Sequence, residues 1–376
     1  MANLIGEGHA QPRLTTGDNR PAAPLRKGWT TGTCAAAAAA AAYQALLTSA
    51  FPDPVTVVLP RGGTVTLPLH RCRLEAARAM ASVIKDAGDD PDVTHGAEVV
   101  ATVEAAPTGH GLSFHAGEGV GTVTLPGLPI AVGEPAINPG PRQMIRDALT
   151  AIAARAGTAA DARVTIAIPG GAALAERTLN GRLGILGGLS ILGTTGIVQP
   201  FSCAAWIHAI HRGIDVARAA GLSHIAAATG SVSEAAVQRL FGLPDAALID
   251  MGDFAGGLLK YLRTHPVPRL TFAGGFAKLV KLAQGHLYLH SAKSRVDLAA
   301  LVQVLAQLPG GGEAAAAAAG AETAAQVLAA ADAHRVPLAD AIAAQARAVA
   351  AGMLTPETAL DVLVFNRAGE LIGRAG

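Results

Sequence analysis

Three threonines precede a run of eight alanines in the stretch LRKGWTTGTCAAAAAAAAY, which begins at residue 25. With two basic residues upstream they form one polar cluster: Arg26, Lys27, Thr30, Thr31 and Thr33. A threonine hydroxyl at a helix start accepts a hydrogen bond from a backbone N–H that has no partner within the helix, and one such residue is enough. A helix N-terminus with basic neighbours also attracts a carboxylate or phosphate. The cluster therefore predicts either a capped helix start or an anion-binding site.

Cys34 follows this cluster at the start of the predicted helix. A thiol at a helix N-terminus can have a lowered pKa and act as a nucleophile. Because the sequence identifies no histidine partner for it, we interpret Cys34 as a small buried thiol.

A second cluster of ionisable residues lies in the stretch VIKDAGDDPDVTHG, from residue 83 to residue 96. Its members are Lys85, Asp86, Asp89, Asp90, Asp92 and His95. Such residues are common in solvated turns. Clustered carboxylates also suit a divalent cation, although the stretch lacks the glutamate that ends an EF-hand loop. In a third interpretation the stretch is the polar wall of an active site, where Asp86, Asp89 or His95 accepts a proton.

A long glycine- and proline-rich stretch, HAGEGVGTVTLPGLPIAVGEPAINPGPRQMI, begins at residue 115. Its glycine spacing is not that of a dinucleotide-binding loop, because the last interval is too short and a strand is predicted where a helix should follow. Arg142 and Arg146 lie on one face of a predicted helix. They either bind ligand carboxylates or form a solvated helix face.

The most informative stretch is PGGAALAERTLNGRLGILGGLSILGTTGIVQPFS, from residue 169. Its glycines permit close approach of the backbone to a ligand, and it lacks the Gly-Lys-Ser/Thr sequence of a phosphate-binding loop. Further along, polar residues stand at the ends of predicted strands, where they either cap helices or bind ribose hydroxyls. Together these residues predict a nucleoside-binding set: Gly187, Gly188, Thr194, Thr195, Gly196, Thr229, Gly230 and Asp250.

Two different patterns along the chain predict the elements that position these residues. Up to about residue 158, a helix at 34–47, a hairpin around residues 60–63, strands within AEVVATVEA and GVGTVTLPG, and a helix at 142–155 indicate an α+β domain. After that, short apolar runs that end in polar or glycine residues alternate with helical patterns, which is typical of a parallel sheet. These runs are RVTIAIPGG, HIAAATGS, AALIDMGD and RLTFAGGF.

The predicted fold class is therefore α/β with two domains. The first is an α+β domain, and the second is a doubly wound, Rossmann-like α/β domain with an added helical tail. We expect a flexible leader over residues 1–24, a substrate-side domain over 25–158, a nucleoside-binding domain over 159–300, and an alanine-rich helical tail over 301–376 that packs on the second domain.

Composition excludes several classes of function. The net charge of +1 does not indicate nucleic acid or an anionic membrane as a partner. The three cysteines lie far apart, which argues against a disulfide framework and against a zinc site, and we expect no protein-bound metal. The N-terminal stretch lacks the features of a secretory signal, and no stretch is long and apolar enough to span a membrane. We expect a cytoplasmic protein, and its glycine- and alanine-rich faces could pair in a homo-oligomer.

Four stretches of the sequence resemble the signatures of one known family. GWTTGTCAAAAA, KDAGDDPDVTHG, GEPAINPGPRQMI and LNGRLGILGGLSILGTTGIVQPFS are similar, in this order, to those of the cobalt-precorrin-5B C1-methyltransferases of cobalamin biosynthesis. The resemblance extends over about residues 25–297. It implies S-adenosylmethionine as methyl donor and a cobalt-precorrin tetrapyrrole as acceptor, which would become cobalt-precorrin-6A. It also implies that the cobalt belongs to the substrate, and it brings no established catalytic residue.

The residues suit that chemistry. The acceptor class carries acetate and propionate arms, which arginine binds well through its two-pronged guanidinium. The expected substrate-binding set is Arg26, Lys27, Thr30, Thr31, Thr33, Lys85, Arg142 and Arg146, with Arg61 as a further basic neighbour. Asp86, Asp89 or His95 would be the base if the acceptor must lose a proton. The alternatives are a corrinoid-binding protein without chemistry and a dinucleotide oxidoreductase, for which the required Gly-x-Gly-x-x-Gly sequence is missing.

Overall fold

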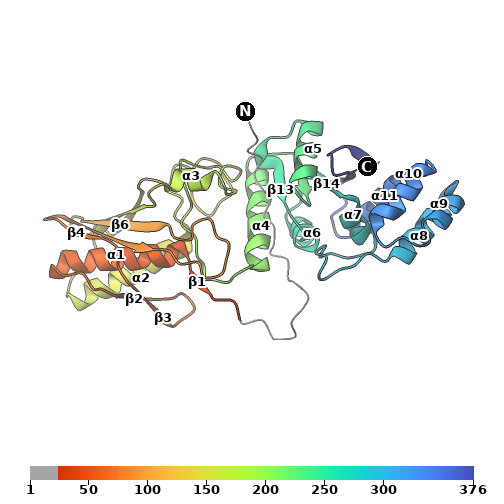
Figure 1. The fold of residues 1–376 in the computed structure, drawn as a ribbon. Coiled ribbons are helices and arrows are strands. Elements are labelled where there is room, and N and C mark those ends of the chain that lie inside the picture. The colour runs from red at the N-terminus through yellow and green to blue at the C-terminus, as the bar shows by residue number, and fades with distance from the viewer. Residues whose placement is uncertain (1–23) are drawn as a thin grey trace, which may run out of the picture. The chain divides into compact units, whose positions relative to one another are not determined.

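The computed structural model describes residues 24–376, so the expected leader lies outside the described residues except for Pro24. The described chain divides into two compact units (Figure 1). The N-terminal unit consists of Leu25–Ala205 and Asp215–Ala220, and the C-terminal unit contains Trp206–Ile214 and Gly221–Gly376. The main division therefore falls later in the chain than the boundary expected after residue 158.

A five-stranded mixed sheet forms the centre of the N-terminal unit, with the strand order β4-β5-β6-β9-β7. Neighbouring strands are antiparallel except for β9 and β7, which are parallel. Along β6 the alternate residues Val99, Ala101 and Val103 are fully buried, as the two-residue period of a strand requires. The strands are Cys72–Leu74 (β4), Arg78–Ile84 (β5), Glu98–Ala105 (β6), Leu112–Ala116 (β7) and Ala162–Ala167 (β9).

Helix α1 (Thr31–Thr48) contains the alanine run and is enclosed on all sides, because every alanine from Ala35 to Ala42 is at most 3% exposed. It contacts β5 and β6 of the sheet and also helix α2 (Pro139–Arg155). A helix that is apolar on every face is stable only when it is buried, and alanine combines high helix propensity with a side chain small enough for close packing. The alanine run therefore makes α1 the central helix of this unit.

Short strands bring distant segments of the N-terminal unit together. The predicted hairpin around residues 60–63 is confirmed, and two further pairs are antiparallel. The pairs are Val55–Val58 (β2) with Thr64–Leu67 (β3), Gly28–Trp29 (β1) with Ile197–Val198 (β11), and Thr122–Val123 (β8) with Ile185–Leu186 (β10); the short helix α3 is Gly171–Ala175. The pairing of β1 with β11 places the start of α1 beside the glycine-rich stretch.

The C-terminal unit is built on a second five-stranded sheet, with the order β13-β12-β14-β15-β16. All neighbouring strands are parallel except β15 and β16. Because β13 and β14 lie on opposite sides of β12, the direction of winding reverses beside β12. The strands are His224–Ala228 (β12), Leu248–Asp250 (β13), Arg269–Gly275 (β14), Ala359–Phe365 (β15) and Leu371–Ala375 (β16).

Helices connect and cover this sheet. Helix α5 contacts the four parallel strands, α11 contacts β15, β16 and α7, and α8 to α10 form a group that also contacts α7 or α11. Helix α4 contributes residues to both units. The helices are Cys203–Ala219 (α4), Ser231–Phe241 (α5), Ala255–Thr264 (α6), Phe276–Ala283 (α7), Leu298–Gln307 (α8), Gly311–Ala317 (α9), Ala324–Ala333 (α10) and Leu338–Ala351 (α11), with a short 3₁₀ helix at Asp245–Ala247.

Two predictions about the sheets are wrong. The run RVTIAIPGG does not begin the C-terminal sheet but forms β9, between β6 and β7 of the N-terminal sheet. In β9 the residues Ala162, Val164 and Ile166 are buried, and a short apolar pattern of this kind does not indicate which sheet a strand joins. The C-terminal tail is also not wholly helical, because β15 and β16 lie in it and complete the parallel sheet.

Candidate functional site

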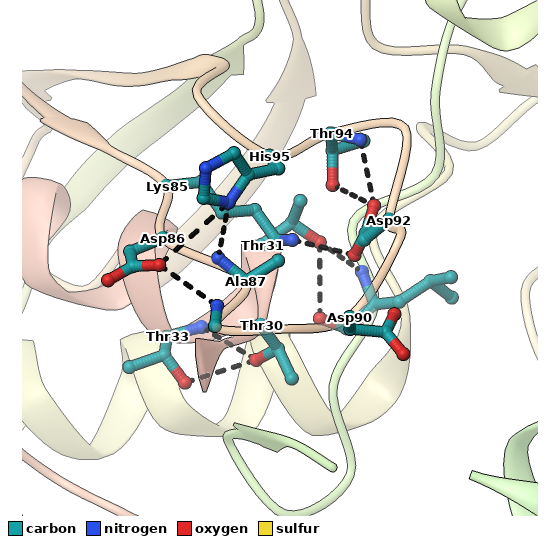
Figure 2. Close-up of polar contacts among 12 residues, drawn as sticks. Thr30, Thr31, Thr33, Lys85, Asp86, Ala87, Asp90, Asp92, Thr94 and His95 are labelled. Atoms are coloured by element: carbon teal, nitrogen blue, oxygen red, sulfur yellow. Dashed lines mark hydrogen bonds and ion pairs between the residues drawn. The ribbon is translucent and has the colours of Figure 1, made fainter. Parts of the chain in front are cut away.

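The start of α1 is the first of the predicted sites (Figure 2). Thr30 is the N-cap residue, and its Oγ1 accepts a hydrogen bond from the backbone N–H of Thr33 at 3.2 Å. Thr31 Oγ1 donates to the carbonyl of Leu192 at 3.2 Å and accepts from its N–H at 2.9 Å. Thr33 Oγ1 donates to the carbonyl of Gly196 at 2.6 Å. The three hydroxyls thus cap the helix and fasten the glycine-rich loop to it.

Glycines in that loop allow the close contact. A Cβ at Gly193, where φ is +141°, would lie 2.2 Å from Thr30 Oγ1, and one at Gly196, where φ is +81°, would lie 2.9 Å from Thr33 Oγ1. A Cβ at Gly188 would lie 2.4 Å from the backbone of Gly119. These glycines therefore serve the packing of backbone against backbone or side chain. Whether they also contact a ligand stays a prediction.

The predicted nucleoside-binding residues fall into two groups. Gly187, Gly188 and the segment from Thr194 to Gly196 belong to the N-terminal unit, whereas Thr229, Gly230 and Asp250 belong to the C-terminal unit. In the first group Thr195 Oγ1 is engaged with Ile197, since it donates to that residue's carbonyl at 3.1 Å. This division was not predicted, because the two groups lie in stretches of similar composition.

Lys85 is a buried cation, with 1% of its side chain exposed. Its Nζ donates to Asp92 Oδ2 at 2.6 Å, while Asp92 Oδ1 accepts from the N–H and the hydroxyl of Thr94 at 2.8 and 2.6 Å. Burial raises the pKa of Asp92. The charge of Lys85 and these hydrogen bonds together lower it by more than burial raises it, so the pKa lies below its ordinary value. This pair stabilises the turn internally, and a carboxylate arm of a ligand would reach Lys85 only by displacing Asp92.

Asp86 is paired with Arg26. Arg26 Nη1 and Nη2 both donate to this carboxylate, the second at 2.9 Å, and the N–H of Gly88 donates to Oδ1 at 2.9 Å. Chiefly through the hydrogen bond from Arg26, the pKa of Asp86 falls to about 2. Asp86 is therefore ionised at neutral pH and is a very weak base. Asp89 and Asp90 accept from the backbone N–H groups of Arg26 at 2.6 Å and Phe201 at 2.8 Å.

His95 stands over the same turn with 53% of its side chain exposed. Its Nδ1 accepts a hydrogen bond from the N–H of Ala87 at 3.1 Å and lies 3.8 Å from Asp86 Oδ1. In a neutral imidazole one nitrogen accepts and the other carries the proton. With Nδ1 engaged as the acceptor, Nε2 is the N–H, so His95 in this arrangement offers a hydrogen bond to a ligand and not a proton-accepting lone pair.

Arg142 and Arg146 extend over the ring of Phe114. Their guanidinium carbons lie 5.5 and 4.9 Å from the ring centroid. Arg142 also donates to the carbonyl of Ile137 at 2.8 Å and to Glu134 at 3.1 Å, so it fixes the loop before α2. Among the described residues, Arg146 makes no hydrogen bond to this loop. The contribution of both arginines to ligand binding stays a prediction.

Cys34 is buried, and burial raises the pKa of its thiol to about 12. A thiol with so high a pKa is protonated at neutral pH and is not a nucleophile. The interpretation of Cys34 as a small buried thiol is confirmed.

The carboxyl edge of the C-terminal sheet gathers a second set of polar groups. Thr229 and Gly230 follow β12, and Asp250 ends β13. Lys278 Nζ donates to the carbonyl of Thr229 at 2.6 Å and lies 3.1 Å from Asp253 Oδ1. This edge lies at the reversal of winding beside β12, which is where open parallel sheets bind ligands.

Three further residues of this edge were not among the predicted site residues: Trp206, Asp253 and Lys278. Trp206 Nε1 donates to the carbonyl of Asp250 at 3.2 Å. Asp253 ends the run AALIDMGD, in which Asp250 was predicted as a site residue, so its position at the strand end could have indicated it. Lys278 and Trp206 lie inside helices, where no local pattern distinguishes a functional side chain from a solvated one.

Among residues 24–376, no group of three or more His, Cys, Asp or Glu side chains is placed to hold a metal ion. Within the same residues no helix has the length and apolar character needed to cross a membrane.

Comparisons with known proteins agree over most of the chain. Two family models match: CbiD over residues 18–200, and CbiD, C-terminal domain, over residues 288–376. A cobalt-precorrin-5B C(1)-methyltransferase of Paramagnetospirillum magneticum is 57% identical, over 93% of this chain and 98% of its own length. One from a Bradyrhizobium species is 58% identical, over 93% and 94%. A crystal structure of a cobalamin biosynthesis protein (cbiD) from Archaeoglobus fulgidus shares 27% identity over 69% of this chain and 79% of that one, with a TM-score of 0.38.

Proposed function

This chain belongs to the CbiD family, and we propose that it methylates carbon 1 of cobalt-precorrin-5B with S-adenosylmethionine as the donor, to give cobalt-precorrin-6A. The observation that carries this function is identity above 50%, over more than nine tenths of the chain, to proteins named cobalt-precorrin-5B C(1)-methyltransferase. That the chain is a C-methyltransferase of cobalamin biosynthesis follows from these relatives. The identity of the methyl donor and the roles of individual residues are our own proposals.

The chemical step needs positioning more than acid–base catalysis. Carbon 1 of the macrocycle attacks the methyl carbon of the sulfonium, a C–C bond forms, and the C–S bond breaks. The electron pair of that bond goes to sulfur, and S-adenosylhomocysteine leaves as a neutral thioether. Because the sulfonium is already a good leaving group, holding the two reactants in line supplies most of the acceleration, for which effective molarities of ~10⁵ M or more are known.

We assign the donor to the C-terminal unit. Its parallel strands, with the winding reversed beside β12, support a Rossmann-like arrangement. Thr229 and Gly230 supply hydrogen-bonding groups at the switch point, and the carboxylate of Asp250 suits the two hydroxyls of a ribose. We leave the predicted residues Gly187, Gly188 and Thr194 to Gly196 out of the donor site, because they belong to the N-terminal unit and Gly196 is bonded to the start of α1.

We assign the acid-bearing acceptor to the N-terminal unit. The turn around Asp86 and the segment before α1 carry the exposed cations Arg26 and Lys27 and the exposed ring of His95. These groups suit the carboxylate arms of a tetrapyrrole. In this proposal His95 donates its Nε2–H to an arm, and Asp86 orients Arg26; neither removes a proton from the macrocycle.

The function is tested by mass spectrometry of the tetrapyrrole after incubation with the purified protein and donor labelled with ¹³C in its methyl group. A mass gain equal to one labelled methyl group supports the proposal, and NMR then locates the label on carbon 1. A tetrapyrrole that is bound but gains no label would instead indicate a carrier without chemistry.

The role of His95 is tested with two variants. A hydrogen bond to a charged group contributes about 1.5–3 kcal/mol, so His95→Ala should raise the acceptor KM by about tenfold or more. His95→Gln retains an N–H donor and should recover most of that loss. If both variants reduce kcat equally and leave KM unchanged, His95 is a proton acceptor and our assignment is wrong.

A further inference from the structure

Aromatic side chains gather beside the carboxyl end of β13, in a chain where aromatic residues make up only 3%. Trp206 of α4 lies next to Phe254, with ring centroids 6.3 Å apart, and Phe254 lies next to Tyr288 at 5.1 Å. The interplanar angles of the two pairs are 36° and 28°, so each ring is tilted against its neighbour and neither pair is perpendicular. We call Trp206, Phe254 and Tyr288 the aromatic row.

Trp206 is held firmly although it is not part of the core. Its indole N–H donates to the carbonyl of Asp250, and a Cβ at Gly252 would lie in van der Waals contact with its six-membered ring, at 3.4 Å. Gly252 has φ of +52°, a conformation that favours glycine. Even so, Trp206 remains 37% exposed. A large apolar ring that is fixed by a polar anchor and left open to solvent is typical of a binding surface.

The charged groups around the aromatic row indicate which kind of planar ligand it would bind. Asp250 ends the strand that the indole contacts, and Asp253 follows three residues later beside Lys278. Lys278 balances the charge of Asp253, so the edge is not simply anionic. A carboxylate such as Asp250 accepts hydrogen bonds from hydroxyl groups, and a ribose joined to a planar base supplies both, as in the adenosyl group of the donor.

From this placement we infer that Trp206 is the stacking residue for the adenine ring of the donor, with Phe254 and Tyr288 behind it. The inference rests on the proposed use of S-adenosylmethionine and adds the residue that recognises its base. Stacking of a base on an aromatic ring is substantial, and removal of the ring should weaken binding by about tenfold.

The test is calorimetric titration of the purified chain with S-adenosylhomocysteine. Trp206→Ala should raise Kd by about tenfold, and Trp206→Phe, which keeps a ring, by only about two- to threefold. Trp29→Phe serves as the matched control, because Trp29 lies in the N-terminal unit, and its Kd should equal that of the unchanged chain. Thermal unfolding of each variant separates a binding loss from a folding loss.

A second readout does not depend on removing Trp206. The chain has two tryptophans, so Trp29→Phe leaves Trp206 as the only indole. Its emission should change on addition of S-adenosylhomocysteine, with saturation at the calorimetric Kd. If the unchanged chain binds the ligand but the emission and the Trp206→Ala Kd do not change, the inference is overturned while the proposed function stands.

Two further outcomes also overturn it. A Trp206 emission that responds to a carboxylated porphyrin and not to S-adenosylhomocysteine would assign the aromatic row to the acceptor. An unchanged chain that does not bind S-adenosylhomocysteine at all would overturn the donor assignment itself, and the inference with it.

Discussion

The start of α1 and the carboxyl edge of the C-terminal sheet both gather glycines and polar side chains, yet they use them differently. At the start of α1 the hydroxyls of Thr31 and Thr33 bond to the backbone of the loop from Leu192 to Gly196 and are almost fully buried. At the sheet edge the indole of Trp206 is anchored and still exposed. A cluster of polar residues in a sequence can therefore serve to hold two segments of the structure together, whereas a single exposed aromatic ring can indicate a binding surface.

The largest effect should come from breaking the buried ion pair of the N-terminal unit. Lys85→Met leaves Asp92 without its cation, and loss of one partner of a buried pair costs about 3 kcal/mol or more. Urea denaturation should show this loss, while Lys260→Met on the exposed face of α6 should change the free energy of unfolding by less than about 0.5 kcal/mol. Equal effects of the two substitutions would mean that the Lys85–Asp92 pair is not structural.

The next effect should come from the loop that packs on Thr30. Gly193→Ala introduces a Cβ 2.2 Å from Thr30 Oγ1 at a positive φ, so clash and backbone strain together should cost about 2–3 kcal/mol. The matched control is Gly181→Ala, since a Cβ at Gly181 has no atom within 4 Å. A Gly193→Ala variant as stable as this control would show that the loop is not tightly fastened to α1.

A smaller effect should follow from the loss of one hydroxyl. Thr33→Val keeps the shape of the side chain but removes the hydrogen bond to Gly196 in a fully buried position, at a cost of about 1–2 kcal/mol. Thr48→Val, at the exposed end of the same helix, is the control and should be close to neutral. If Thr33→Val instead raises the acceptor KM with unchanged stability, the threonines at the start of α1 bind ligand and do not serve a purely structural role.

The smallest effect should be a pH dependence from Asp86. Its pKa in the folded chain is about 2, below the ordinary value of 3.8, so its pairing with Arg26 stabilises the fold fully above about pH 4. That contribution is lost as the pH falls from there toward 2. The pair is 58% and 44% exposed, so the effect is modest. Asp86→Asn should weaken the loss of stability between pH 5 and pH 3; an unchanged profile would show that the pair contributes nothing.

The sequence predicted elements better than it predicted their partners. The alanine helix, the hairpin around residues 60–63 and the strands His224–Ala228, Leu248–Asp250 and Arg269–Gly275 are confirmed, because each has a local period or turn signal. The sheet that β9 joins depends on pairing between residues 50 or more positions apart, as in Val103 with Val164 and Leu112 with Ala162. No local pattern records such pairing.

The same limit applies to the sites. The sequence identified the polar residues of the turn around Asp86, but not that Arg26 and Lys85 neutralise two of its carboxylates. It identified Asp250 from its place at a strand end, but not Trp206, which comes from a helix 44 positions earlier in the chain. Residue type and local pattern are visible in a sequence, whereas the charge balance and exposure of a site depend on the tertiary structure.

Binding of the donor by the C-terminal unit is the central claim, because the other site assignments depend on it. The direct measurement is the calorimetric Kd for S-adenosylhomocysteine of two variants, Asp250→Asn and Thr33→Val, beside the unchanged chain. Loss of charged hydrogen bonds to ribose should raise the Kd of Asp250→Asn by about tenfold, while that of Thr33→Val should not change. A weakened Thr33→Val variant with an unaffected Asp250→Asn variant would place the donor at the start of α1 and contradict the account.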